Sequence, residues 1–339
     1  MKNVWIFVCI MLWSSTLFAQ EKEAYTFRDY SEMRAEFGKL FQRKEYEKAA
    51  EMIEWALPKY PGHVHANSFN LAFVYLNLKN YEKSMAALEY GHEHGAWFNI
   101  YLLEDDGFKP VRETVRFKKI KAKNEEIRLE IQKNTRPDML VVTPEGYDPD
   151  REYPLFLALH GGSSNAMAFR DIWISDKMKK EFIIVYLQSS RIVAPDGYSW
   201  TVDLDISRKE IEDACKKVFK EYPVNKKLVI IGGFSAGGAA SIESVLYDVA
   251  PFTGFIILCP PESEGVNMDR IREAQKRGVQ GVILATEMDP GLPFQKKLDR
   301  IMTEAGLRHK FIIAPDTGHW FPSDFKEQLD SAIEFIMEK

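Results

Sequence analysis

The chain has 339 residues, of which 45% are hydrophobic and 28% are charged, an ordinary composition for a globular protein. Its length suggests about two domains. The formal net charge is −5, and no basic patch with interleaved aromatic residues occurs, so nucleic acid is not an expected partner.

The first residues have the pattern of an export signal. Lys2 supplies a positive charge, and an apolar stretch over 4–17 follows it. A cleavage position follows at Ala19. The apolar run is shorter than the roughly 18 to 20 residues of a membrane span, and no basic flank follows it. We therefore expect 1–19 to be a signal peptide and the protein to be exported, to the periplasm or the medium if the source is bacterial.

Residues 20–133 have a helical composition and an internal repeat. The segment EYEKAA at 45–50 recurs as NYEKSM at 80–85, displaced by 35 residues. A period near 34, with an aromatic residue followed three residues later by a small one, resembles the tetratricopeptide repeat, a helix–turn–helix unit. Gly91 stands where that repeat usually has alanine. We expect this region either to pack against its neighbour or to bind a peptide or protein partner.

From residue 134 to residue 339, strand and helix patterns alternate. This alternation predicts an α/β fold, with a mostly parallel sheet covered by helices on both faces. Only one expected strand precedes the buried strand at 153–160, so the sheet should have few strands at its first edge. The expected strands are 139–143, 153–160, 182–187, 227–232, 254–259, 280–285 and 309–314, and the expected helices are 167–179, 207–221, 235–249, 263–277, 293–305 and 322–338.

A glycine-containing loop follows the strand at 153–160. Glycines let the backbone come close to a tetrahedral intermediate and aim N–H donors at its oxyanion. We expect Gly162 to supply one donor of an oxyanion hole, with Gly161 and Ser163 as neighbours. His160 is expected to form a structural hydrogen bond within the loop and not to act as a catalytic base.

The segment LVIIGGFSAGG at 228–238 has the layout of a nucleophile elbow. An aliphatic strand ends in Gly-x-Ser-x-Gly, and a helical pattern rich in small residues follows. The glycines two residues before and after Ser235 remove side chains that would clash in such a turn. Ser235 is the expected nucleophile, and the backbone N–H of Ala236 is the expected second oxyanion donor.

A histidine and several acids follow in the order that this layout requires. His319 lies in a Pro/Gly loop after the strand at 309–314. Asp289 lies in an Asp-Pro turn just past the strand at 280–285, where a loop can bring a carboxylate back over the sheet. Glu287 and Asp316 are the alternatives.

Together these segments resemble the α/β-hydrolase superfamily, and more narrowly the carboxylesterase, phospholipase and polyhydroxybutyrate-depolymerase-like esterases. The resemblance is carried by LHGG at 159–162, GFSAG at 233–237, the Asp-Pro turn at 289–290 and the Gly-His pair at 318–319. It implies ester hydrolysis through an acyl-enzyme, with no metal and no organic cofactor. Ser235 would be the nucleophile, His319 the general base and then acid, and Asp289 the group that orients the imidazole.

Two tryptophans are candidates for the substrate pocket. Trp200 lies in the irregular stretch 187–207, which is either a cap loop whose aromatic residues line the acyl or alcohol pocket or a packed loop. Trp320, beside His319, presents the same two alternatives. The substrate remains open among small esters, lipids and acylated polysaccharides.

Cleavage of the signal would leave two cysteines, Cys215 and Cys259. Two cysteines in an exported chain permit one disulfide but give no framework. We expect two buried thiols, because a domain of this size needs no covalent staple.

Three functions follow from these patterns, and an exported carboxylic-ester hydrolase is the one that we expect. A serine peptidase of the prolyl-oligopeptidase type can share this fold and triad, but it usually carries a propeller domain, which a helical region of about 100 residues is not. The third is a non-catalytic protein that binds through its helical repeats.

Overall fold

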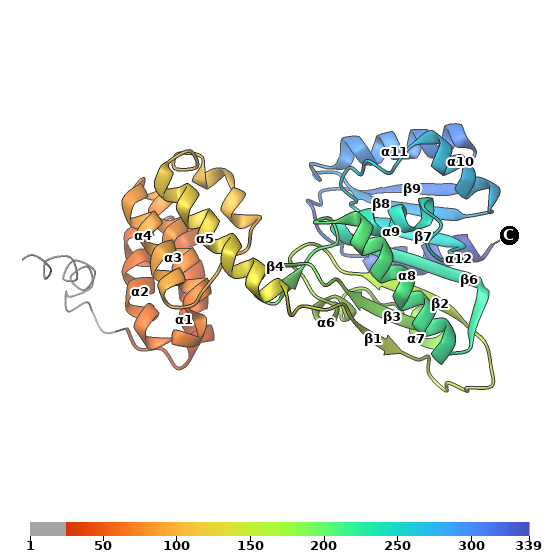
Figure 1. Cartoon of the computed structure of the whole chain (residues 1–339), viewed down its shortest axis with the longest axis horizontal. Coiled ribbons are helices and arrows are strands. Elements are labelled where there is room, and N and C mark those ends of the chain that lie inside the picture. The colour runs from red at the N-terminus through yellow and green to blue at the C-terminus, as the bar shows by residue number, and fades with distance from the viewer. Residues whose placement is uncertain (1–24, 339) are drawn as a thin grey trace, which may run out of the picture. The chain divides into compact units, whose positions relative to one another are not determined.

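The computed structural model describes residues 25–338, which divide into two compact units (Figure 1). Unit 1 ends at Arg128 and unit 2 begins at Leu129, close to the sequence division at 133/134. The expected signal segment, 1–19, lies outside the described residues. Among the helices of 25–338, none is both long enough and apolar enough to span a membrane.

The regular secondary structure in the described part of unit 1 is all helical. Small buried residues such as Ala49, Ala56 and Ala72 allow its helices to pack closely. Helices α2 and α4 begin at Tyr46 and Tyr81, so the two repeated segments occupy the same place in successive helical hairpins. The elements are α1 (Tyr30–Gln42), α2 (Tyr46–Lys59), η1 (Pro61–His63), α3 (Val64–Asn77), α4 (Tyr81–Glu93), η2 (Leu102–Glu104), η3 (Asp106–Phe108) and α5 (Val115–Gln132), the last of which runs past the unit boundary.

Gly91 of α4 has a packing reason to lack a side chain. A Cβ atom at this position would lie 2.5 Å from Phe98 Cζ and 3.0 Å from Ser68 Cβ. Alanine, usual here in the repeat that the sequence resembles, would therefore require the Phe98 ring to move.

Unit 2 is built on a seven-stranded sheet with the order β1-β3-β2-β6-β7-β8-β9. Edge strand β1 pairs antiparallel with β3, and the other neighbours are parallel. All seven expected strands are present, and β1 is the single strand that precedes β2 in the chain. The strands are β1 (Asp138–Val142), β2 (Tyr153–Leu159), β3 (Ile183–Gln188), β6 (Val224–Phe234), β7 (Gly254–Leu258), β8 (Gln280–Thr286) and β9 (His309–Ala314).

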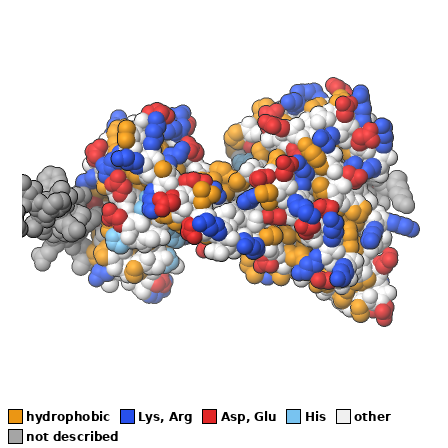
Figure 2. Space-filling view, in the orientation of Figure 1, with side chains coloured by type: hydrophobic (Ala, Val, Ile, Leu, Met, Phe, Trp, Pro, Cys, Tyr) orange, Lys and Arg blue, Asp and Glu red, His pale blue; other side chains and the backbone are white. Residues whose placement is uncertain are grey.

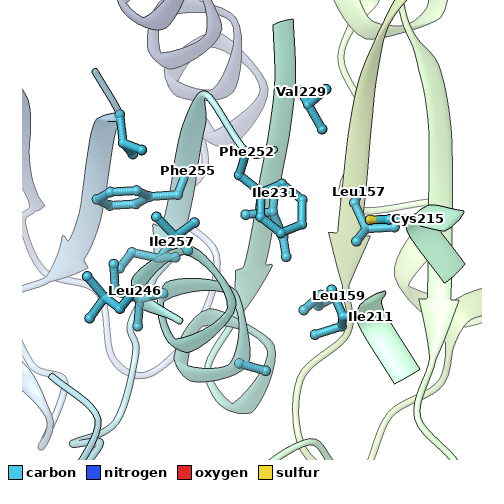
Figure 3. Close-up of a cluster of buried hydrophobic side chains, with 14 of the residues drawn as sticks. Leu157, Leu159, Ile211, Cys215, Val229, Ile231, Leu246, Phe252, Phe255 and Ile257 are labelled. Carbon is cyan, nitrogen blue, oxygen red and sulfur yellow. The ribbon is translucent and has the colours of Figure 1, made fainter. Parts of the chain in front are cut away.

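Helices cover both faces of this sheet because its central strands are apolar on both sides. Leu157 of β2 belongs to one core with residues of α8, α9, α10 and α11, and its neighbour Phe156 belongs to the other core with α6, α7 and α12. Figure 3 shows the first core, in which Ile231 and Ile257 come from adjacent strands. The helices are α6 (Ala166–Arg170), α7 (Asp176–Glu181), α8 (Leu204–Glu221), α9 (Ala236–Leu246), α10 (Met268–Lys276), α11 (Leu292–Ala305) and α12 (Phe325–Met337).

Two details of unit 2 differ from the expectation. The helix expected over 167–179 is split into α6 and α7, because Trp173 between them is fully buried and Ser175 caps α7 through the Met178 N–H. The stretch expected to be irregular contains a two-stranded hairpin, β4 (Ile192–Ala194) with β5 (Gly197–Tyr198).

Both described cysteines are free and buried, which confirms the expectation of two thiols. Cys215 of α8 belongs, with Leu157, to the core of Figure 3, and Cys259 follows β7 at the end of the sheet. Figure 2 shows Lys and Arg side chains interspersed with Asp and Glu on the visible faces of both units, a distribution consistent with the near-neutral composition.

Candidate active site

Ser235 stands in a strained turn between β6 and α9. Its backbone angles are φ 53° and ψ −117°, in the region that disfavours side chains. The flanking glycines make the turn possible: a Cβ atom on Gly237 would lie 2.2 Å from Leu159 O, and one on Gly233 would lie 2.6 Å from Gly237 C. The Ser235 N–H donates to Leu258 O at 2.8 Å, which ties the turn to β7. The elbow expected from the sequence is therefore present.

Gly237→Ala should lower the free energy of unfolding by about 3 kcal/mol or more, because the clashing atoms are backbone carbonyls of β2 and its loop. Gly238→Ala is the matched control, since its nearest neighbour would be Gly233 O at 3.2 Å. Urea unfolding of both variants checks this. Equal losses would mean that the close approach at Gly237 relaxes without cost.

His319 lies in the loop between β9 and α12, with its Nε2 atom 2.8 Å from Ser235 Oγ. The strand β8 and the loop after it hold this histidine loop in place. Thr286 Oγ1 donates to Gly318 O at 2.6 Å, and the Met288 N–H donates to Thr317 O at 2.9 Å. The imidazole is thus fixed from the β8 side while 40% of its side chain remains exposed.

Among the three acids considered from the sequence, Asp289 contacts the histidine. Its Oδ1 atom lies 3.0 Å from His319 Nδ1, and its side chain is only 2% exposed. Glu287 instead accepts a hydrogen bond from the Asp316 N–H at 3.0 Å. Burial by itself raises the pKa of Asp289, but hydrogen bonds from the Gly291 N–H, Gln295 and other donors outweigh it and leave the pKa lowered. The carboxylate is therefore charged when it faces the imidazole.

Two neighbours of Asp289 carry no signal in the sequence. Gln295 Nε2 donates to Asp289 Oδ2 at 2.6 Å from within α11. Cys259 has its Sγ atom 3.3 Å from Thr286 Oγ1 and within 4.8 Å of an Asp289 carboxylate oxygen. Each lies on a different element, so only the folded sheet reveals the contact.

Cys259, Asp289 and His319 form the one group of potential metal ligands found among the described residues, with ligand atoms within 4.8 Å of one another. The close approach of these three side chains is explained without a metal ion. Asp289 and His319 already hydrogen-bond each other, and burial raises the pKa of the Cys259 thiol to about 12, which disfavours the thiolate that binds metals.

The expected oxyanion loop lies against the elbow. A Cβ atom on Gly161 would lie 2.8 Å from the Phe234 ring, so this loop directly adjoins the residue before the nucleophile. Ser163 has φ 62°, which turns the chain sharply just after Gly162. Ala236 is the first residue of α9, a position whose N–H has no carbonyl partner within its helix. Donation by Gly162 and Ala236 to an oxyanion stays a prediction.

His160 is buried in the same loop and is used at both ring nitrogens. Nε2 accepts a hydrogen bond from the Ser189 N–H at 3.3 Å, so Nδ1 carries the proton and donates to Gly161 O at 2.7 Å. Burial lowers the pKa of His160 to about 4. The histidine is a neutral structural group, as expected.

His160 should make stability fall as the pH falls. Its pKa of about 4 in the folded protein lies below the ordinary 6.5, so the unfolded chain binds more protons between these values. The stabilisation is complete above pH 6.5 and is lost towards pH 4. The unfolding free-energy difference between wild type and His160→Asn should shrink by about 2–3 kcal/mol from pH 7.5 to 4.5. Denaturant unfolding at both pH values measures it, and a constant difference would contradict the shift.

The two candidate pocket tryptophans have different environments. Trp200 is fully buried, with its ring 5.3 Å from that of His160, so the expectation that it lines a pocket is corrected: it belongs to a packed loop. Trp320 is 60% exposed, and its ring stands edge-on to Phe234 at 6.0 Å. The ring of Phe234 in turn lies 5.0 Å from that of His319, so Trp320 is an accessible aromatic surface close to the candidate site.

No protein-family model and no curated protein matches the chain. Among solved structures, an uncharacterized protein from Bacillus cereus is 22% identical over 91% of this chain and 98% of its own, with a TM-score of 0.50. A ferulic acid esterase from Anaeromyces mucronatus is 18% identical over 58% of this chain and 85% of its own, with a TM-score of 0.47. An esterase from Thermogutta terrifontis is 15% identical over 60% and 90%, with a TM-score of 0.48.

At these identities the likeness bears on the fold alone. The sheet order, the helices on both faces and the elbow after β6 define an α/β-hydrolase fold, and helices α1 to α5 precede it. The predicted fold class is confirmed: an α/β-hydrolase fold that follows an all-α region.

Proposed function

We propose that this chain is a serine hydrolase that cleaves carboxylic esters through an acyl-enzyme. The observation that carries the proposal is a continuous hydrogen-bonded chain across three loops. It runs from Ser235 Oγ to His319 Nε2 at 2.8 Å, and from His319 Nδ1 to Asp289 Oδ1 at 3.0 Å. A nucleophile, a base and an orienting acid at these distances constitute the geometry that acyl transfer requires.

The mechanism assigns one role to each residue. Ser235 Oγ attacks the ester carbonyl while His319 takes its proton, and the Asp289 carboxylate stabilises the imidazolium. His319 then returns the proton to the leaving alcohol as the carbon–oxygen bond breaks. Water attacks the acyl-enzyme by the same route and releases the acid. The N–H groups of Gly162 and Ala236 are the proposed donors to the oxyanion in both steps.

Labelling with a fluorophosphonate tests the nucleophile directly. Ser235 should displace fluoride and form a phosphonate ester, found on the peptide that contains residue 235 after digestion. Ser235→Ala should not be labelled. An unlabelled wild type, or a label that persists in Ser235→Ala, would overturn the assignment.

Comparison of an ester with a peptide anilide then addresses the reaction. Faster turnover of a short p-nitrophenyl ester supports the esterase proposal, whereas a preference for the anilide would replace it with the serine peptidase alternative. An unlabelled protein that turns over neither substrate would favour the non-catalytic alternative.

We propose that Trp320 lines the substrate region. The support is its exposure of 60% and its edge contact with Phe234, which precedes the nucleophile. An exposed indole face suits an apolar or ring-bearing part of an ester. Small esters, lipids and acylated polysaccharides all supply such a part.

We also propose that the protein is exported and that the helical hairpins of unit 1 act as a tetratricopeptide-like unit for a protein partner. The matched places of the repeated segments in α2 and α4 support the second idea. N-terminal sequencing of the mature protein tests the first, with a start at Gln20 expected. Cross-linking of the full chain in its source cells tests the second, with cross-links from α2 or α4 to another protein expected.

A further inference from the structure

Each oxygen of the Asp289 carboxylate has its own hydrogen-bond partners. Oδ1 is shared by His319 Nδ1 at 3.0 Å and by the Gly291 N–H at 2.9 Å. Oδ2 accepts a short hydrogen bond, 2.6 Å long, from Gln295 Nε2. The carboxylate is therefore held at both oxygens, and Gln295 supplies the donor at Oδ2.

Burial makes this amide unusual in its surroundings. Gln295 is fully buried, next to core residues of α11 such as Phe294 and Leu298. Its Oε1 atom has no hydrogen-bond partner within 25–338. An unpartnered buried oxygen costs about 1–3 kcal/mol, a cost that a methionine of similar size would avoid. The bond to Asp289 is thus the contact that accounts for an amide at this position, since the other Nε2 contact, to Pro260 O, is longer at 3.4 Å.

We propose that Gln295 is a positioning residue that sets the orientation of the Asp289 carboxylate towards His319. The inference rests on the proposed function. With both oxygens held, rotation about the bond that carries the carboxyl group is blocked, and Oδ1 stays in line with the imidazole. Without the Gln295 donor, the carboxylate can turn about its Gly291 contact and move Oδ1 away from Nδ1. Misplacement of about 1 Å in a catalytic group can reduce the rate about 100-fold.

Two variants separate positioning from packing. Gln295→Met keeps the volume and removes the donor. Gln295→Glu keeps the shape and supplies a donor only while the introduced carboxyl is protonated. Two carboxyl groups this close cannot both ionise readily, so one of them should hold its proton above its ordinary range. Phe294→Leu is the control for a core change on the same helix, because the Phe294 ring belongs to the hydrophobic core and cannot donate a hydrogen bond to Asp289.

The kinetic result expected for Gln295→Met is a 10- to 100-fold lower kcat for a p-nitrophenyl ester, with KM within about twofold of wild type. Its activity relative to wild type should not change with pH. Gln295→Glu should approach wild-type activity at the acid end of the measurable range and fall progressively below it as the pH rises. Phe294→Leu should lower stability and leave kcat within about twofold.

A kcat for Gln295→Met within twofold of wild type would overturn the proposal. So would two Gln295 variants with the same pH-independent ratio, because packing alone predicts that result. Neither outcome bears on the nucleophile assignment, which fails if the wild type is not labelled by fluorophosphonate or if the label persists in Ser235→Ala.

A second readout needs no substrate, so it tests the role of Gln295 even if the proposed ester hydrolysis is wrong. Proton NMR of the wild type should show a far-downfield resonance from the His319 Nδ1 proton shared with Asp289, assigned by its loss in Asp289→Ala. Gln295→Met should shift this resonance upfield or broaden it, and Phe294→Leu should leave it in place. An unchanged resonance in Gln295→Met would show that Asp289 is held without Gln295.

Discussion

Ser235→Ala should lower kcat for a short p-nitrophenyl ester by about 10⁵-fold or more while the protein remains folded. The methyl group that remains cannot attack the carbonyl, so no acyl-enzyme forms and His319 has no proton to take from residue 235. The residual rate would come from substrate binding and the oxyanion donors, which by themselves give about 10³- to 10⁴-fold over water. Steady-state kinetics, with active-site titration of the wild type, measures the loss.

Ser244→Ala on the same helix is the matched control. Ser244 Oγ donates to Ala240 O at 2.7 Å within α9, so its hydroxyl is used inside the helix and not by the triad. Its removal should leave kcat within a few-fold of wild type. A comparable loss in both variants would mean that damage to α9, and not the missing nucleophile, explains the result for Ser235→Ala.

The sequence predicts the parts of this site that are encoded locally. An aliphatic strand that ends in Gly-x-Ser-x-Gly predicts a sharp turn at the serine. Ser235 has the positive φ of such a turn, and the flanking glycines permit the close backbone contacts around it. Asp289 and His319 each follow their own apolar strand. Because the carboxyl ends of parallel strands meet at one edge of the sheet, these three separate segments are expected to come together there.

The parts that the sequence did not predict depend on contacts between elements. In the sequence, Gln295 is one polar residue of a helix and Cys259 is a thiol at the end of a strand. Only the packing of α11 beside the loop after β8, and the pairing of β7 with β8, brings them to the site. The sequence leaves two environments possible for Trp200, a substrate pocket or a packed loop, because a loop has no periodicity that distinguishes them. Its burial follows from the β4–β5 hairpin and the neighbouring His160 ring, which are tertiary features.

Asp289→Ala should lower kcat by about 10⁴-fold, because the imidazole loses both its orientation and the charge that stabilises its protonated form. Asp289→Asn should lose clearly less. An asparagine in place of the triad acid can hold the histidine in the wrong tautomer, but here the Gly291 N–H donates to the Oδ1 position and favours the amide oxygen there. That oxygen can still accept from His319 Nδ1, which keeps Nε2 free to take the Ser235 proton.

The amide nitrogen of Asp289→Asn would then face Gln295, whose Oε1 has no partner in the described structure and can accept from it after the glutamine amide turns over. This second contact favours one orientation of the asparagine amide. The double variant Asp289→Asn/Gln295→Met lacks the contact, so its kcat should no longer exceed that of Asp289→Ala. Kinetics of the two single variants and the double variant measure the coupling. Equal activities of Asp289→Asn and Asp289→Ala would contradict the argument, because they would mean that the carboxylate acts only through its charge and that the donors around it do not set the tautomer.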